Sequence, residues 1–375
     1  MTTAAFNVLE IGGTPRQRGR AHGEGLRAAI AERDRRWRQQ IEVACKMPAA
    51  DFIVRFLAET RFTSAIGRWT PDLLEEVRGI AEGSGLAYDA VLAAQFMDEE
   101  WWFQQGLAAS GNHHCSSFAA RRGGGTLMGQ TMDLPTWMDG SQTLLLIRDA
   151  APETDAFVVT SAGMIGLMGI NSRGVGISVN TLLQLQHATD GLPVAFVTRG
   201  LLTQPDFAAA ARFVRSIRHA SGQNYVLADP SRVATFECSA RAAVEQAQGP
   251  RVWHTNHPLA NRDVKPDPAN GGWLNQLRNS EARYAALERR LAPAAEVTRG
   301  LAQDTLSSCD DADHPVSRAI VTGKNDGPGG FFTFAAMIAE LADDPVVWAA
   351  PGAPSVTAFA PYQFRTSAAA RSYGT

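Results

Sequence analysis

The chain has 375 residues, of which 45% are hydrophobic and 19% are charged, as is typical of a globular protein. Its net charge of −3 argues against a broad basic surface that would bind nucleic acid or an anionic membrane. No apolar run reaches the ~18 residues that a membrane span needs, and the first residues lack the pattern of a signal peptide. We therefore expect a soluble, cytoplasmic protein with neither nucleic acid nor a membrane as partner.

The cysteines are too few and too far apart to form a structural framework. They stand at positions 45, 115, 238 and 309, and no two form a CxxC pair. A disulfide scaffold or a zinc ribbon is therefore not expected.

The first third of the sequence has the pattern of helices. Thr14, Pro15 and Gln17 combine an N-cap, a first-turn proline and a capping-box residue, and apolar residues then recur at helical spacing as far as Lys46. A second helix is expected to begin at 70–71 and to end at Gly83 and Gly85. A third is expected over 88–102.

After residue 112, short β-rich runs bounded by turn residues take over. Strands are predicted over 116–120, 126–133, 143–147, 156–160, 165–169, 175–179, 224–228, 233–237, 332–340 and 346–350. Helices are predicted over 205–218 and 280–291. Groups of strands separated by groups of helices, with no repeat or low-complexity linker, favour an α+β or layered-sheet protein. Length alone suggests two or three domains, although a single α/β domain can reach this size.

Cys115 stands at the start of a predicted hairpin. The strands 116–120 and 126–133 are joined by a glycine turn, and a hairpin centred on Gly124 places Cys115 directly across from Asp133. A thiol facing a carboxylate is a plausible beginning of a nucleophile site. The alternative is a buried structural cysteine, which is the more common use of this residue.

Several stretches, taken in chain order, resemble one enzyme family. They are 12–23 (GGTPRQRGRAHG), 114–117 (HCSS), 129–133 (GQTMD), 169–176 (GINSRGVG), 223–229 (QNYVLAD), 254–257 (HTNH) and 350–354 (APGAP). The family is that of acyl-coenzyme A:6-aminopenicillanate acyltransferase (isopenicillin N acyltransferase), a branch of the N-terminal-nucleophile (Ntn) hydrolases that also contains carcinine and β-alanyl-dopamine hydrolases. The resemblance spans nearly the whole chain. It implies an α+β fold, a four-layer αββα sandwich, and no cofactor.

The resemblance also implies that the chain cuts itself between His114 and Cys115. The products are a small chain, 1–114, and a large chain, 115–375, which together form one Ntn-hydrolase domain and a heterodimer of fragments. The cut frees the α-amine of Cys115, whose reference pKa of about 7.7–8.0 suits a general base at neutral pH. His114 departs from the family pattern, in which a small residue is common here, and this departure is expected to slow the cut or alter its geometry.

By resemblance, Asp133 and Asn256 complete the catalytic site with Cys115. Asp133 orients the freed ammonium group, and Asn256 donates a hydrogen bond to the oxyanion. The alternatives are a strand-end aspartate that caps the turn at Pro135 and a turn asparagine. We expect His254 and His257 to be structural or to line the pocket, and not to act as bases.

Two further positions are expected to contact substrate. Arg318, with Ser317, resembles a family site and could bind a substrate carboxylate or lower the thiol pKa, although a solvated arginine is an equal alternative. Trp102, in the aromatic run 101–103, is expected either to line the acyl pocket or to pack in the core.

The function expected from these residues is hydrolysis of a small N-acyl or N-aminoacyl amide through a thioester. The alternative is transfer of an acyl group from a thioester such as acyl-CoA to an amine. A hypothesis outside this class is a non-catalytic metal-binding protein that uses His113, His114, Cys115 and the nearby acids at 98–100. The oligomeric state is open.

Overall fold

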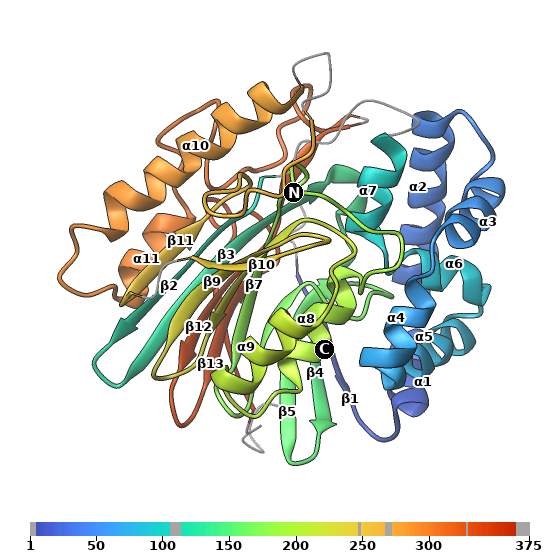
Figure 1. Cartoon of the computed structure of the whole chain (residues 1–375), viewed down its shortest axis with the longest axis horizontal. Helices are drawn as coiled ribbons and strands as arrows, with labels where there is room; N and C mark the ends of the chain where they lie inside the picture. Colours follow the sequence, from blue (N-terminus) through green and yellow to red (C-terminus); the bar gives the residue numbers. More distant parts are fainter. Residues whose placement is uncertain (1–4, 106–113, 247–248, 267–271, 328, 365–375) are drawn as a thin grey trace.

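The computed structural model of the chain describes residues 5–105, 114–246, 249–266, 272–327 and 329–364. Over these residues two β-sheets lie in the middle of the molecule and helices cover their outer faces (Figure 1). The predicted α+β, four-layer αββα fold is therefore confirmed. No described helix combines the length and the apolar character of a membrane span.

Within the described residues the larger sheet has eight strands. Their spatial order is β1 (Asn7–Ile11), β4 (Gln142–Ala151), β5 (Thr154–Ser161), β6 (Met168–Asn171), β7 (Gly176–Thr181), β8 (Gln223–Ala228), β9 (Val233–Cys238) and β10 (Ala243–Gln246). The smaller sheet, counted over the same ranges, has six strands. Their order is β11 (Arg251–His254), β2 (Ser116–Arg122), β3 (Gly125–Pro135), β12 (Phe331–Leu341), β13 (Val346–Ala350) and β14 (Ala360–Gln363).

Helices form the outer layers. Those between β1 and β2 are α1 (Pro15–Gly25), α2 (Arg27–Cys45), α3 (Ala49–Glu59), α4 (Phe62–Trp69), α5 (Pro71–Ser84), α6 (Tyr88–Ala93) and α7 (Met97–Gln105). The later helices are α8 (Val194–Leu202), α9 (Phe207–Ser216), α10 (Gly272–Leu291) and α11 (Arg299–Leu306). A 3-10 turn, Thr136–Met138, follows β3.

Three buried clusters correspond to the three interfaces between the four layers. On β2, Phe118 packs with Leu287 and Leu306 of α10 and α11, whereas Ala119 packs between the sheets with Leu144 of β4. Successive side chains of a strand point to opposite faces, so one strand serves both interfaces. A third cluster joins the larger sheet to the helices α1–α9.

The predicted helices form, with two differences. The capping box of Thr14 and Gln17 is present, but the first helix divides into α1 and α2 at Leu26. The helix expected over 88–102 is interrupted between α6 and α7, where Gln95 hydrogen-bonds to the backbone of Gly163 and Ile165. Helices α3, α4, α8 and α11 were not predicted individually. Helix α8 is buried on all sides and so lacks an amphipathic stripe.

Most predicted strands are present, although the run expected over 165–169 begins only at Met168. The short strands β1, β10, β11 and β14 were not predicted. Each has four or five residues, so the alternation of side chains carries little signal.

Residues of the stretch 12–23 hold helices α1 and α5 against each other and against segments that follow position 115. A Cβ atom on Gly19 would lie 1.8 Å from the carbonyl oxygen of Glu76, so only glycine allows this approach of the two backbones. The Glu76 carboxylate lies 3.5 Å from Arg18 Nε and accepts two hydrogen bonds from Arg199 of α8, at 2.7 and 3.0 Å. His22 Nε2 accepts the backbone N–H of Gly163. This motif is therefore structural.

Candidate active site

Four adjacent strands of the smaller sheet bring the predicted catalytic residues to one edge. Cys115 directly precedes β2, Asp133 lies near the end of β3, and Asn256 follows β11. Because neighbouring strands here are antiparallel, the start of β2, the end of β3 and the end of β11 meet at the same edge. The start of β12, with Thr333, lies there too.

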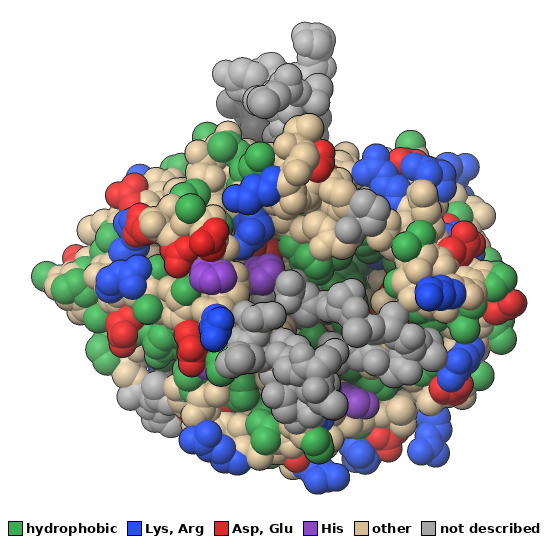
Figure 2. Space-filling model, turned by 90° about the horizontal axis from the view of Figure 1, so that it is seen from above, with side chains coloured by type: hydrophobic (Ala, Val, Ile, Leu, Met, Phe, Trp, Pro, Cys, Tyr) green, Lys and Arg blue, Asp and Glu red, His purple; other side chains and the backbone are tan. Residues whose placement is uncertain are grey.

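This edge faces the side of the molecule seen in Figure 2. Charged side chains of both signs are interspersed over that face, and hydrophobic side chains are visible in a recess near its centre.

The register of the hairpin differs by one residue from the prediction. Ser116 pairs with Thr131 and Arg122 with Gly125, so the loop consists of Gly123 and Gly124 alone. Gly124 has φ +86°, a left-handed conformation that glycine adopts at no steric cost. In this register the residue opposite position 115 is Met132, so the prediction that Asp133 lies directly across was wrong. Asp133 still contacts Cys115, because its backbone N–H forms a hydrogen bond with the thiol.

Cys115 is buried, with 5% of its surface exposed. Burial and the neighbouring Asp133 carboxylate raise the pKa of its thiol to about 12 in the continuous chain, against the opposing effects of the Asp133 N–H and the Arg283 guanidinium. The thiol is therefore protonated at neutral pH, and it needs a base before it can act as a thiolate.

Asp133 has one carboxylate oxygen bound and one without a partner. Oδ1 accepts a hydrogen bond of 2.7 Å from the hydroxyl of Thr333, which itself accepts the backbone N–H of Arg318 at 2.8 Å. Oδ2 is buried and has no hydrogen-bond partner among the described residues. Burial raises the pKa of Asp133 to about 6, although Thr333, Arg283 and Arg318 each lower it. The unpaired oxygen is suited to a cationic partner.

Arg283 of α10 links the nucleophile to Asn256, and no motif of the sequence pointed to it. The side chain is fully buried. Nη1 donates to the carbonyl oxygen of Cys115 at 2.6 Å and to the hydroxyl of Ser116 at 3.0 Å, and Nη2 donates to Asn256 Oδ1 at 2.9 Å. The sequence signal was weak: Asn279 and Arg283 share the helix face of Leu287 at intervals of four residues.

Asn256 is held in one orientation by two neighbours. Its Oδ1 accepts from Arg283, and its Nδ2 donates to the carbonyl oxygen of Thr181 at 3.0 Å. A side-chain amide carries two N–H hydrogens, so one remains for another acceptor. This geometry suits an oxyanion donor.

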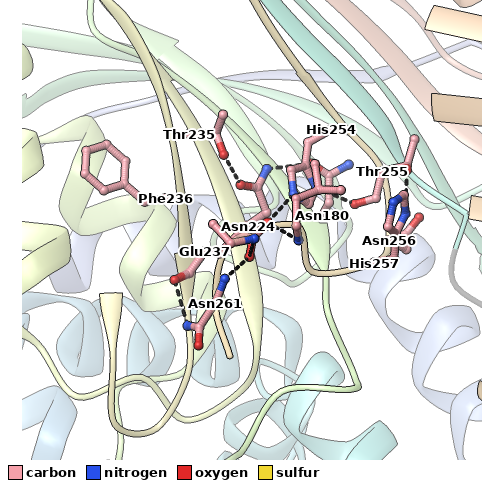
Figure 3. Close-up of polar contacts among 12 residues, drawn as sticks. Asn180, Asn224, Thr235, Phe236, Glu237, His254, Thr255, Asn256, His257 and Asn261 are labelled. Carbon is pink, nitrogen blue, oxygen red and sulfur yellow. Dashed lines mark hydrogen bonds and ion pairs between the residues drawn. The ribbon is translucent and has the colours of Figure 1, made fainter. Parts of the chain in front are cut away.

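A buried carboxylate anchors the segment that carries Asn256 (Figure 3). Glu237 lies 2.9 Å from His254 Nε2 and accepts the backbone N–H groups of Leu259, Ala260 and Asn261. Although burial raises the pKa of Glu237, these hydrogen bonds and the His254 ring lower it below its usual value overall. His254 therefore has a structural contact, as predicted.

The other flanking histidine also has a structural contact. His257 Nδ1 lies 2.8 Å from Ser280 Oγ, and burial lowers the pKa of His257 to about 4. The ring is therefore neutral at physiological pH, and its contact with Ser280 is compatible with a structural role.

His114 lies against the same network on the other side of Cys115. Its Nδ1 is 2.6 Å from Asn279 Oδ1, which also accepts from Arg283 Nε at 2.9 Å. The ring packs edge-on against Phe331. The residues on both sides of the expected cut are thus connected to Arg283.

The structure places the residues expected to contact substrate in different surroundings. Arg318 lines an open groove with His114 and influences the pKa of Asp133. The hydroxyl of Ser317 donates to Ser355 Oγ and so joins two loops. Trp102 stacks on His187 in the core, and its neighbour Trp101 lines the pocket of Cys115 instead. The helical position of Trp101, three residues after Asp98, was the available signal.

The pocket at Cys115 is enclosed and mostly apolar. Its lining consists of Met97, Asp98, Trp101, Cys115, Met132, Asp133, Leu134, Gly166, Leu167, Val179, Thr181 and Val194. The space free for a water-sized molecule is about 20 Å³, enough for about one water.

The described part of the chain contains no cluster of metal-ligating side chains that would support the metal-binding hypothesis. No group of three His, Cys, Asp or Glu side chains there is arranged to hold a metal ion. Asp98 binds Thr181 and Gln223, Glu99 binds Ser221, and Glu100 binds Trp37. His113 lies outside the described residues.

Comparison with known proteins decides the family. The profile described as "Acyl-coenzyme A:6-aminopenicillanic acid acyl-transferase" matches residues 120–343, more than half of the chain. This chain belongs to that family. The resemblance found in the sequence is therefore confirmed. The matched range contains Asp133, Asn256, Arg283 and Arg318 and begins just after Cys115.

More distant similarities were also found. A curated relative, Protein dcd1A of Dictyostelium discoideum, is 30% identical over 109 residues, which are 25% of this chain and 25% of that protein. The match thus spans about a quarter of the relative's length. Penicillin V acylase from Agrobacterium tumefaciens has a TM-score of 0.39 and 14% identity, over 63% of this chain and 83% of its own. A mutant of conjugated bile acid hydrolase from Clostridium perfringens has a TM-score of 0.41 and 9% identity, over 66% and 92%.

Proposed function

We propose that this protein is a self-processing cysteine amidohydrolase, which cuts itself before Cys115 and then hydrolyses a small N-acyl or N-aminoacyl amide. The observation that supports it most directly is the convergence of Cys115, the unpaired oxygen of Asp133 and the fixed amide of Asn256 at one sheet edge. Membership of the acyltransferase family supports the same chemistry.

The cut proceeds by an N-to-S acyl shift. Cys115 Sγ adds to the carbonyl carbon of His114, the C–N bond breaks, and the thiol proton passes to the nitrogen. Water then hydrolyses the thioester, giving a carboxylate at His114, a restored thiol and a free α-amine on Cys115. Arg283 holds the carbonyl oxygen of Cys115, which limits movement of this residue while the bond before it changes.

In the turnover reaction the α-amine is the base for its own thiol. It accepts the Sγ proton, the thiolate attacks the substrate amide, and the free N–H of Asn256 donates to the developing oxyanion. The ammonium, paired with Asp133 Oδ2, returns the proton to the leaving amine. Water, activated by the same amine, hydrolyses the thioester and regenerates the thiol.

The Cys115→Ala variant tests the proposal by intact-mass measurement beside the wild type. The wild type is expected to give two fragments, 1–114 and 115–375, and the variant a single chain without amidase activity. N-terminal sequencing that finds no chain beginning at Cys115 in active protein would contradict the proposal.

Acyl transfer is the alternative fate of the same thioester, and the family description names an acyltransferase. Adding a competing amine to the assay and measuring both products distinguishes the two. Hydrolysis predicts that free acid remains the main product, whereas acyl transfer predicts that a new amide replaces it. Elemental analysis of the purified protein tests the metal-binding alternative in parallel.

A further inference from the structure

An open groove of about 620 Å³ lies at the end of strand β2 that points away from Cys115. Helix α9, the turn before β9, the end of β10 and the end of β2 form its walls. Arg121, which lines it, stands six positions after Cys115, and a strand rises about 3.3 Å per residue. The groove is therefore about 20 Å from the nucleophile, and the proposed catalytic steps do not use it.

Positive charge dominates this groove, which we call the arginine groove. Four arginines and one glutamate line it, namely Arg121, Arg212, Arg215, Arg232 and Glu245. Glu245 pairs with Arg215, whereas the other three arginines form no ion pair with a described residue. Like charges that are held close together repel one another, so an anion bound between these side chains would stabilise the groove.

Two of the four guanidinium groups lie over aromatic rings. That of Arg232 is 5.8 Å from the centre of the Phe207 ring, and that of Arg215 is 5.0 Å from the centre of the Phe236 ring. A guanidinium group over a ring still presents N–H donors at its edge. Because these contacts already restrict the two side chains, less conformational freedom is lost when an anion binds.

One side of the arginine groove is apolar. Ala208, Ala211 and Arg215 follow one another at intervals of three and four residues, so they share one face of α9. The two short alanine side chains leave space beside the helix, and Val233 and Pro250 also line it. The volume lies within the range of about 300–1,000 Å³ that is usual for small-molecule sites. An organic group can therefore lie against this side while an anion contacts the arginines.

We propose that the arginine groove binds a diphosphate group, either within an organic molecule or as free pyrophosphate. The paired N–H donors of a guanidinium group match the oxygens of a phosphate. A single phosphate carries a charge of about −1.5 to −2 at neutral pH, less than the three arginines without an ion pair supply.

Other anionic partners fit this groove less well. An acidic peptide presents singly charged carboxylates spaced along a chain, whereas the arginines surround one compact space. The net charge of −3 leaves no broad basic surface for nucleic acid.

Isothermal titration calorimetry of the purified protein tests this inference, with pyrophosphate, ADP, AMP and hexa-aspartate as separate probes. We expect a diphosphate, as ADP or pyrophosphate, to bind at least tenfold more tightly than AMP, and hexa-aspartate to bind more weakly than the diphosphate. Tighter binding of ADP than of pyrophosphate would identify an organic diphosphate as the ligand, and the reverse order would identify the free ion.

The double variant Arg212→Gln/Arg232→Gln removes two of the proposed contacts. We expect its Kd for the diphosphate to rise tenfold or more, because two charge-assisted contacts are lost. Both side chains are exposed, so the variant is expected to fold. The single variant Arg212→Gln gives an independent measurement, with an expected rise of threefold or more.

Arg27→Gln/Arg61→Gln is the matched control, because it removes the same charge from two exposed arginines outside the groove. Lys324→Gln examines the other basic groove, beside His114. Both are expected to keep the wild-type affinity.

The inference is overturned if neither diphosphate binds, if AMP binds as tightly as ADP, or if hexa-aspartate binds most tightly. It is also overturned if the arginine variants bind as the wild type does, or if either control variant loses the affinity. These measurements do not depend on amidase activity, so they judge the groove separately from the proposed function.

Discussion

At the scale of single residues, the proposed catalysis depends on how Arg283 and Asp133 hold the groups around Cys115. Arg283 fixes the carbonyl oxygen of Cys115 and the amide oxygen of Asn256, so it acts as a positioning residue in the proposed mechanism. Thr333 fixes Asp133 in turn. Both arrangements predict measurable effects of substitution.

The first prediction concerns Arg283. Arg283→Lys retains a positive charge but loses the guanidinium fork that contacts Cys115, Ser116 and Asn256 together. Loss of a correctly oriented oxyanion donor costs about 10²–10³ in rate. We therefore expect kcat to fall by roughly this factor, with a smaller change in KM.

The control is Arg278→Lys, an exposed position on the same helix, which is expected to leave both kinetic constants unchanged. A rise in KM with kcat unchanged in Arg283→Lys would indicate that Arg283 binds substrate, and it would contradict the positioning role.

The second prediction concerns the acid limb of the pH profile. In the continuous chain the pKa of Asp133 is about 6, raised by burial and lowered by the Thr333 hydroxyl. The carboxylate must be ionised to hold the ammonium of Cys115, so kcat/KM is expected to fall as the pH drops through the Asp133 pKa. That ammonium, once formed, lowers this pKa, so the midpoint is expected at or below about 6.

Thr333→Val removes the hydrogen bond to Asp133 and is expected to move the acid limb to higher pH, because the bond lowers the pKa. Thr131→Val is the matched control, since the buried Thr131 hydroxyl has no hydrogen-bond partner among the described residues. If the midpoint of the acid limb does not move in Thr333→Val, or moves equally in both variants, Asp133 does not determine that midpoint.

At the scale of secondary-structure elements, close contact between α1 and α5 holds the N-terminal helices together. The backbones meet at Gly19 and Gly79, where a Cβ atom would lie 1.8 Å from Glu76 O and 2.2 Å from Arg16 O respectively. The buried carboxylate of Glu76 at the same contact binds Arg199 of α8. Glycine in a helix usually costs stability, so these positions are explained by packing.

The third prediction follows from this contact. Gly19→Ala is expected to lower the free energy of unfolding by roughly 1–3 kcal/mol, because one helix must move to admit the methyl group. Gly67→Ala in α4 is the matched control: nothing lies within 4 Å of its Cβ position, so the change is expected to be neutral or stabilising by up to about 1 kcal/mol.

Urea unfolding of both variants in an uncleaved Cys115→Ala background measures the difference. Equal midpoints for Gly19→Ala and the parent would contradict the close approach of α1 and α5.

At the scale of the whole molecule, the two expected fragments are parts of one folded unit. Strand β1 pairs in parallel with β4 of the larger sheet, and the cluster beneath that sheet combines residues from before and after position 115. Glu76 and Arg199 form a buried ion pair between the two parts, with both side chains at most 2% exposed. The proposed cut would therefore divide the chain but not the core.

The fourth prediction is that fragments 1–114 and 115–375 remain associated after self-cleavage. Size-exclusion chromatography under native conditions is expected to give one species that contains both fragments, and denaturing electrophoresis is expected to separate them. Separation of the fragments under native conditions would contradict this view of the core.

The sequence by itself determined the local features of this protein. The capping box at Thr14, the glycine hairpin after Cys115 and most of the longer strands were predicted correctly, because each depends on neighbouring residues or on a simple period. The motifs also identified the family and named Cys115, Asp133 and Asn256, which the structure brings to one edge of the smaller sheet.

Only the tertiary structure decided the contacts between distant segments. The hairpin register depended on a loop one residue shorter than expected, and Trp101 rather than Trp102 reached the pocket because of the way α7 packs. Arg283 lies 168 residues from Cys115 in the sequence, and the pocket of Asp98 combines residues of α7, β3, β7 and α8. Such contacts arise when elements pack together, and no local pattern of side chains encodes them.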